Sequence, residues 1–326
     1  MRAKRLSQWI LTIVVAMVLI FGENAIKQLF FTEKTPITVY APESMQSAFK
    51  KALSASDLSN CKIVMTDDKS KADITVDYGK ENDSRYMQFA FSPFIIAYNT
   101  DDDRFKELKN AEILVSSEYN KKLYEIDFLE VIDEVIEEGK WKNLGVKDIG
   151  TIRLFYPAET TEYWHDFYNF MLMTVNDGKY PSTETEMEKA VEYVERFINS
   201  EYTEAVVDFN ERLNRTDGFC EKCFYVMPEA TAKQLSNDKS EYVRLLFPLQ
   251  TTYMYYYVIG NTDNGKSVVN AIKGSDFFYK LKGNNYRSTE YYELGDVYRS
   301  VYDERDVYNL IEVPKENFFT GNLSSK

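Results

Sequence analysis

Two stretches of the chain share one order of apolar and polar positions. Residues 37–53 read ITVYAPESMQSAFKKAL, and residues 151–172 read TIRLFYPAETTEYWHDFYNFML. Each begins with a short run of β-branched and aromatic residues, which is typical of a buried strand. Each run breaks at a proline, Pro42 or Pro157, and continues through Glu and Ser or Thr into a helical stretch. The pattern therefore predicts two strand–turn–helix units.

The helix of the first unit has one apolar face. Its apolar residues recur at the i, i+3, i+4, i+7 and i+8 spacing of a single helical face. They are Met45, Ala48, Phe49, Ala52 and Leu53. Ser44 stands directly before them, where an N-cap residue is expected. We therefore predict a helix that is capped by Ser44 and buries this face.

The polar turns of the two units are candidate ligand sites. A strand that feeds a helix through a short polar turn leaves backbone N–H groups and hydroxyls at the carboxyl edge of a sheet. Ligands of open α/β sheets bind at that edge. One such turn is an ordinary connection in any α/β domain. Two of them in separate halves of one chain favour two lobes that close on one ligand.

Further strands are predicted from short apolar runs. They cover residues 61–66, 72–78 and 224–227. A longer apolar run, residues 89–98, contains Pro93, which removes one hydrogen-bond donor from a sheet. This run is therefore expected at a sheet edge, as a bent strand, or as a crossing between the lobes.

Further helices are predicted from polar stretches with spaced apolar residues. Residues 101–142 are expected to be helical and to end near Gly139, and a second helix is expected over 201–213. Thr183 and Glu186 have the spacing of a capping box at the start of another helix.

The first thirty residues differ from the rest. Basic residues precede an apolar run, and residues 6–22 form a 17-residue stretch at the lower limit for a membrane span. A cleaved signal peptide is the competing interpretation. Cleavage after Ala25 would place Glu23 at the −3 position, where a small residue is needed. We therefore expect residues 1–30 to be an uncleaved signal-anchor with a short stalk, spanning the cell membrane once, and the body to be extracytoplasmic.

Composition excludes some classes of function. The net charge of −13 argues against nucleic acid as a partner, since phosphates need a basic surface. Cys220 and Cys223 either close a short disulfide or stay as thiols, with Cys61 left over. A single CxxC is weak support for zinc, and the one histidine, His165, lies far away in sequence. We expect neither a metal site nor a cofactor.

The order of these motifs resembles the type 2 periplasmic-binding-protein fold. This fold is found in the solute-binding proteins of ABC transporters, and the molybdate- and sulfate-binding-like branch is the most similar. The motifs are ITVYAPESMQSAFKKAL, ADITVDYG, FSPFIIAYN, TIRLFYPAETTEYW, FYVMPEATAKQL and VRLLFPLQTTYMYYYVIG. Together they cover residues 36 to about 287.

The resemblance implies an α/β fold with two lobes, two crossings between them and a ligand in the cleft. Residues 36–98 and 250–290 are expected to form the first lobe, and residues 99–249 the second. Residues 291–326 are expected to be a C-terminal extension. The transmembrane helix precedes the first lobe.

The resemblance also implies a set of ligand contacts. They are Glu43, Ser44, Met45, Asp77, Tyr78 and Ser92 from the first half, and Glu159, Thr160, Thr161, Glu229, Thr252 and Tyr253 from the second. Oxyanion binders of this family present hydroxyls and amides, whereas these turns add four carboxylates. A carboxylate that faces a bound dianion costs several kcal/mol unless it is neutralised. A cationic or polyhydroxylated ligand is therefore favoured over an oxyanion, unless these acids point to solvent beside helix N-termini.

Three functions remain open from the sequence. The leading hypothesis is a membrane-anchored, non-enzymatic solute-binding protein that serves an ABC transporter permease or a sensor. The first alternative is an envelope scaffold without a ligand, whose cleft is filled by its own side chains. The second is a hydrolase that uses two carboxylates, such as Glu43 and Glu159. No nucleophile–base pair or Gly-rich phosphate loop occurs in the sequence, so we expect binding rather than catalysis.

Overall fold

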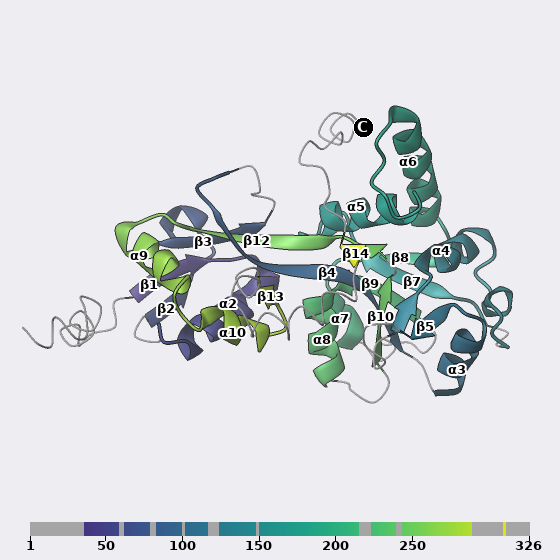
Figure 1. Cartoon of the computed structure of the whole chain (residues 1–326), viewed down its shortest axis with the longest axis horizontal. Coiled ribbons are helices and arrows are strands. Elements are labelled where there is room, and N and C mark those ends of the chain that lie inside the picture. Colours follow the sequence, from purple (N-terminus) through teal and green to yellow (C-terminus); the bar gives the residue numbers. More distant parts are fainter. Residues whose placement is uncertain are drawn as a thin grey trace, which may run out of the picture.

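Two lobes and two long strands between them make up the computed structural model (Figure 1). The strands that run between the lobes are β4 (Met87–Asn99) and β12 (Tyr253–Gly260). The structure describes residues 36–58, 62–78, 83–99, 102–116, 124–147, 150–214, 223–238, 243–248, 250–288 and 309–310.

The first lobe contains β1 (Pro36–Tyr40), α2 (Glu43–Ala55), β2 (Lys62–Met65), η1 (Lys69–Lys71), β3 (Ile74–Tyr78), α9 (Asp263–Ile272), α10 (Phe277–Lys282) and β13 (Arg287–Ser288). Its sheet has the strand order β2-β1-β3-β12-β4. The first three strands are parallel, and β12 runs antiparallel to both of its neighbours. The carboxyl ends of β1 and β3 therefore face the same edge of the sheet.

The second lobe contains α3 (Asp102–Asn110), β5 (Leu114–Ser116), β6 (Tyr124–Ile126), α4 (Phe128–Glu137), η2 (Trp141–Leu144), β7 (Arg153–Pro157), α5 (Trp164–Thr174), α6 (Glu184–Ile198), β8 (Thr203–Val206), α7 (Phe209–Asn214), β9 (Cys223–Pro228), α8 (Glu229–Asp238) and β10 (Val243–Pro248). Strand β7 lies between β8 and β9, and all three are parallel. Strands β9 and β10 both pair antiparallel with β4. The turn after Pro157 therefore lies at the carboxyl edge of these parallel strands, where α7 and α8 also begin.

Strand β4 takes part in the sheets of both lobes. Its first half pairs with β12, up to Pro93 opposite Tyr253. Its second half, from Phe94 onward, pairs with β9 and β10. Of the three arrangements considered for this apolar run, the crossing between lobes is the one that occurs, and Pro93 lies where the strand changes partners.

Helix α2 buries the predicted apolar face but begins differently from the prediction. All five apolar residues of that face, from Met45 to Leu53, are buried. The N-cap is Pro42, with φ −54° and ψ 147°, and no side chain caps the helix. The prediction that Ser44 is the N-cap is therefore wrong. Its hydroxyl lies in the first turn of the helix and is available for contacts outside it.

Two predicted helices are partly strands. Residues 101–142 contain two helices, α3 and α4, separated by β5 and β6, rather than one helical stretch. Gly139 follows α4 with a φ of 58°, as expected for a residue that ends a helix. Residues 201–213 begin as β8, because this segment pairs with β7 in register from Leu154 opposite Thr203. Strand pairing here outweighs the local helical pattern.

The capping box of α6 is confirmed. Thr183 Oγ1 accepts the backbone N–H of Glu186 at 3.2 Å, and the Glu186 carboxylate accepts the backbone N–H of Thr183 at 3.3 Å. Thr183→Ala is expected to lower the free energy of unfolding by about 1 kcal/mol, because the backbone N–H of Glu186 loses its side-chain partner. Urea unfolding of both proteins measures this difference. An unchanged midpoint would contradict the structural role of the box.

Several predictions concern segments outside the described residues. These are the transmembrane segment over 1–30, most of the extension over 291–326, Cys61 and Cys220. Cys223 is buried and disulfide-bonded. In the part of the chain that the structure describes, every helix is too short or too polar to cross a membrane. Residues Asn309–Leu310 form β14, which pairs in parallel with β11 (Gln250–Thr251).

Candidate functional site

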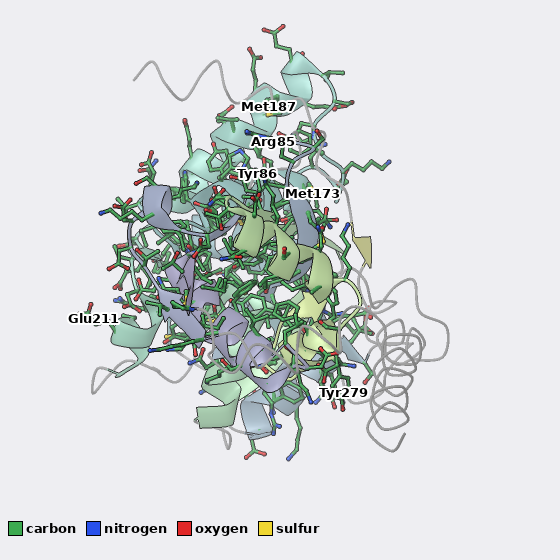
Figure 2. The ribbon with its side chains drawn as sticks, turned by 90° about the vertical axis from the view of Figure 1, so that its left-hand side faces the viewer. Arg85, Tyr86, Met173, Met187, Glu211 and Tyr279 are labelled. Carbon is green, nitrogen blue, oxygen red and sulfur yellow. The ribbon has the colours of Figure 1, made fainter. Side chains whose placement is uncertain are left out.

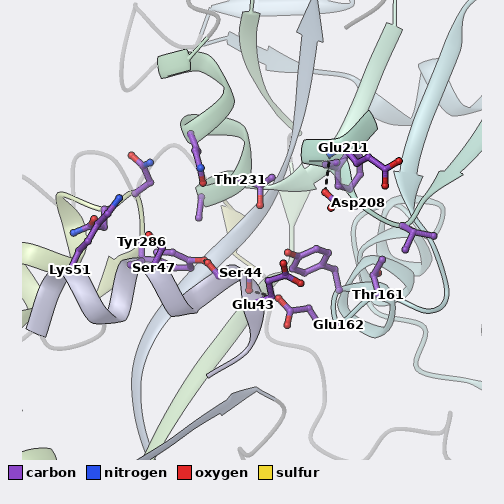
Figure 3. Close-up of a pocket in the computed structure, with 18 of the residues that line it drawn as sticks. Glu43, Ser44, Ser47, Lys51, Thr161, Glu162, Asp208, Glu211, Thr231 and Tyr286 are labelled. Carbon is purple, nitrogen blue, oxygen red and sulfur yellow. Dashed lines mark hydrogen bonds between the residues drawn. The ribbon is translucent and has the colours of Figure 1, made fainter. Parts of the chain in front are cut away.

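A cavity of about 910 Å³ lies between the two lobes (Figure 3). The first lobe contributes the start of α2 and the turn after α10. The second lobe contributes the turn after β7, the segment from β8 into α7, and the start of α8. The lining residues are Glu43, Ser44, Ser47, Ala48, Lys51, Thr160, Thr161, Glu162, Tyr163, Val207, Asp208, Phe209, Glu211, Ala230, Thr231, Gln234, Gly283, Asn284, Asn285 and Tyr286.

A hydrogen bond joins the two lobes at the edge of this cavity. Ser44 Oγ on α2 donates to Glu162 Oε1 in the turn before α5. The Tyr286 hydroxyl donates to the backbone carbonyl of Ser44 at 2.8 Å, and the Tyr256 hydroxyl lies 3.3 Å from Ser44 Oγ. Ser44 is thus held by two tyrosines of the first lobe while it contacts a carboxylate of the second.

Burial raises the pKa values of Glu162 and of the tyrosines around it. Burial raises the pKa of Glu162, although hydrogen bonds from Ser44 and Tyr163 oppose the shift. Burial and the Glu162 charge raise the pKa of Tyr163, and burial also raises the pKa of Tyr286. The pKa of Tyr78 rises to about 12, because of burial first and the Glu162 charge second. These tyrosines therefore stay protonated near neutral pH and keep their O–H groups for hydrogen bonding.

The charged residues of the lining are mostly acidic. Among the described residues that line the cavity, Glu43, Glu162, Asp208 and Glu211 carry carboxylates and Lys51 carries an ammonium group. Glu211 projects outward at the surface, whereas Glu162 is half-buried (Figure 2). Neutral donors and acceptors such as Thr231 and Gln234 make up much of the remainder. Such a lining attracts cations and repels anions.

Four residues expected to contact a ligand do line the cavity. They are Glu43 and Ser44 from the first lobe, and Thr160 and Thr161 from the second. Thr161 Oγ1 donates to the Ala158 carbonyl at 2.7 Å, which holds the turn after β7. The two strand–turn–helix units therefore meet across one cavity.

Four other expected contacts lie in the core or in the crossings. Met45 is fully buried. Ser92 Oγ accepts the N–H of Ala230 at 3.1 Å, and Thr252 Oγ1 donates to the Asp166 carbonyl at 3.3 Å. Tyr253 pairs through its backbone with Pro93 in β4. Of these, Ser92 and Thr252 hold the segments that connect the lobes.

Three further expected contacts also do not line the cavity. The Asp77 carboxylate forms an ion pair with Lys69. Tyr78 follows it at the end of β3 and is half-buried. Glu159 is exposed, although it stands directly before Thr160 in the turn after β7. The pair of Glu43 and Glu159 considered for hydrolysis is therefore not assembled across the cavity.

Glu229 was expected at the ligand but forms a buried ion pair between the lobes. Arg287 Nε and Nη2 donate to its two carboxylate oxygens at 2.7 and 3.0 Å. The Glu229 side chain is 1 % exposed and that of Arg287 is 7 % exposed. Lys233 approaches the same carboxylate at 2.9 Å. A carboxylate so deeply buried needs compensating charge, and Arg287 provides most of it.

This pair predicts a dependence of stability on pH. Burial alone would raise the pKa of Glu229, but the charges of Arg287 and Lys233 lower it from 4.5 to about 2. Between these two values the unfolded chain binds a proton that the folded chain does not. Stability from this group is therefore complete above about pH 4.5 and is lost as the pH falls toward about 2. We expect the stability difference between the natural chain and Glu229→Gln to shrink over this range in urea titrations.

Several cavity residues were not anticipated from the sequence. The most important is Glu162, two positions after Thr160 in the same turn. Asp208 was missed because it fell inside the helix predicted over 201–213. In the structure its carboxylate accepts the backbone N–H of Glu211 at 3.1 Å, at the start of α7. An acidic residue shortly before a short helix was the available signal.

Solved structures of solute-binding proteins share this fold. The sulfate-binding protein SubI from Mycobacterium tuberculosis H37Rv is 13% identical, with a TM-score of 0.52, over 86% of this chain and 93% of SubI. A protein named as a spermidine/putrescine ABC transporter, from Listeria monocytogenes, is 11% identical, with a TM-score of 0.50, over 85% and 93% of the chains. No protein-family model and no curated protein matches the chain. The expected type 2 periplasmic-binding-protein fold is thereby confirmed.

Proposed function

We propose that this chain is an extracytoplasmic solute-binding protein that closes its two lobes around a small polar ligand. The observation that carries the proposal is the 910 Å³ cavity between the lobes of a type 2 periplasmic-binding-protein fold. Both lobes line it, so their relative movement opens and closes it. Its volume lies in the range of cavities that hold small molecules.

The ligand we propose is cationic or polyhydroxylated rather than an oxyanion. The names of the two similar proteins refer to sulfate in one case and to spermidine or putrescine in the other, so the fold itself favours neither sign of charge. The charge of the lining is what supports a cationic or polyhydroxylated ligand. Four carboxylates and one lysine line the cavity among the described residues, and an anion would meet mostly like charge.

The alternatives are less well supported. An envelope scaffold without a ligand was expected to fill its cleft with its own side chains, whereas a cavity of 910 Å³ is present. The carboxylate hydrolase needed Glu43 and Glu159 on opposite sides of a substrate, but Glu159 does not line the cavity. Binding without catalysis therefore fits the site best.

The remaining parts of the proposal concern organisation and partners. We assign residues 36–98 and 250–290 to the first lobe and residues 99–249 to the second. Residues 1–30 anchor the protein in the membrane. The closed protein delivers its ligand to an ABC transporter permease or presents itself to a sensor.

Thermal unfolding of the purified full-length chain tests the proposal. The panel contains amines, amino acids, sugars, sulfate and molybdate. A ligand that binds only the folded state stabilises it by about 2.7 kcal/mol at a hundredfold excess over Kd, which raises the midpoint. We expect a shift with an amine or a sugar. A shift with oxyanions alone would refute the assigned ligand class, and no shift at all would refute the binding function.

A further inference from the structure

Glu162 combines two properties that bear on ligand binding. It lies in the second lobe and lines the cavity. Its carboxylate also accepts the hydrogen bond from Ser44 of the first lobe. A group that bound Glu162 from inside the cavity would therefore touch the connection between the lobes.

We propose that Glu162 is the residue through which a cationic ligand closes the two lobes. The N–H groups of the ligand bind the Glu162 carboxylate from the cavity while Ser44 holds the same carboxylate from the first lobe. This inference rests on the proposed binding function and names both the class of ligand, an amine or guanidinium compound, and the residue that selects it.

The Glu162 carboxylate has room for such a ligand. An ionised carboxylate offers about four acceptor positions on its two oxygens. Three hydrogen bonds reach it, from the Ser44 hydroxyl, the Ser44 backbone N–H and the Tyr163 side chain. These three bonds leave acceptor capacity for about one further donor. A cationic N–H donor is the strongest partner for that capacity, since hydrogen bonds between charged groups are about twice as strong as neutral ones.

A second carboxylate explains how a cation would favour closure. Glu43 stands next to Ser44 on α2, in the first lobe, and Figure 3 shows its side chain beside that of Glu162. The Glu43 charge contributes to the raised pKa of Glu162, after burial. Without a ligand these two carboxylates repel each other across the lobes. A cation between them turns this repulsion into attraction from both sides.

The same geometry predicts how affinity depends on pH. The titratable groups that face Glu162 are Glu43 on α2, Tyr78 on β3, Tyr163 beside it, Tyr256 on β12 and Tyr286 after α10. The tyrosines remain neutral below their raised pKa values. Glu162 must be ionised to bind a cation, so amine affinity rises as the pH increases through its raised pKa and falls below it.

Calorimetric titration of the full-length chain tests the inference. The probes are 1,4-diaminobutane and arginine as cations, glucose as a neutral polyol and sulfate as an anion. Glu162→Gln keeps an oxygen that accepts the Ser44 hydrogen bond but removes the charge. We expect it to weaken binding of the cations by about 10- to 100-fold, the range for a hydrogen bond to a charged group. The matched control is Glu159→Gln, which removes one charge from the same turn outside the cavity and is expected to bind as the natural chain does.

X-ray scattering with the same proteins separates closure from binding. Ser44→Ala keeps the Glu162 charge but removes the hydrogen bond from the Ser44 hydroxyl of the first lobe to Glu162 of the second. We expect it to bind the cations more weakly and to show less ligand-induced compaction than the natural chain. Cation binding by Glu162→Gln at the natural affinity would overturn the inference. Binding of glucose or sulfate but of neither cation would overturn it while the binding function stands. Binding of no compound would refute both.

Discussion

Arg287→Met is expected to lower the free energy of unfolding by about 3–5 kcal/mol, because it leaves Glu229 buried without its main counter-charge. The two residues are almost fully buried, and two hydrogen bonds at 2.7 and 3.0 Å join them. Methionine fills much of the same volume, so the loss reflects charge rather than a cavity. Urea unfolding at neutral pH, with the slope compared between variants, measures it.

Lys233→Met is the matched control for this prediction. Lys233 approaches the same carboxylate at 2.9 Å, but its side chain is 32 % exposed. Water screens its charge, so we expect a loss of at most about 1 kcal/mol. A loss as large as that of Arg287→Met would show that the pair between the lobes is not the dominant interaction of Glu229.

Phe49→Ala is the second substitution with a large expected effect, about 3–5 kcal/mol. Phe49 is fully buried on α2. Its ring packs edge to face against Phe89 of β4 at 5.7 Å and against Phe277 of α10 at 5.3 Å between centroids. Removing the ring opens a cavity among three elements and forfeits these aromatic contacts. Thermal and urea unfolding both report the loss.

Phe49→Leu and Lys50→Ala serve as controls for the ring. Leucine retains much of the apolar volume, so we expect a smaller loss, of about 1–2 kcal/mol. Lys50 is exposed on the same helix, and its truncation is expected to change stability by less than about 0.5 kcal/mol. An equal effect at positions 49 and 50 would contradict the packing described for α2.

The elements predicted correctly from the sequence are those with a long, regular pattern. The apolar face of α2 was predicted in full, because a helix packed on a sheet buries one stripe over several turns. Strands β5 and β6 were missed inside a predicted helical stretch. Each has three residues, too few to show a two-residue alternation. They pair with each other, and β6 also pairs with β10. Their identity depends on partners that the local sequence does not specify.

The ligand site was predicted only in part, because its turns follow a local pattern whereas its side-chain contacts do not. The turns after β1 and β7 were identified from local pattern, and residues of both line the cavity. The partners of individual side chains depend on how the lobes meet. The local sequence around Glu229 predicted a ligand contact, but its partner is Arg287, which lies 58 positions away in the sequence. Glu162 lies in a correctly predicted turn, but its contact with Ser44 spans 118 positions.

Strand β4 also constrains the order in which the chain folds. It ends at Asn99, yet its antiparallel partners β9, β10 and β12 begin only at Cys223. Contacts between residues so distant in sequence slow folding, and an unpaired strand edge promotes association with other chains. A nascent chain synthesised only to residue 222 has none of these partners for β4. We therefore expect both lobes to complete their sheets late and together, rather than as two independent folding units one after the other.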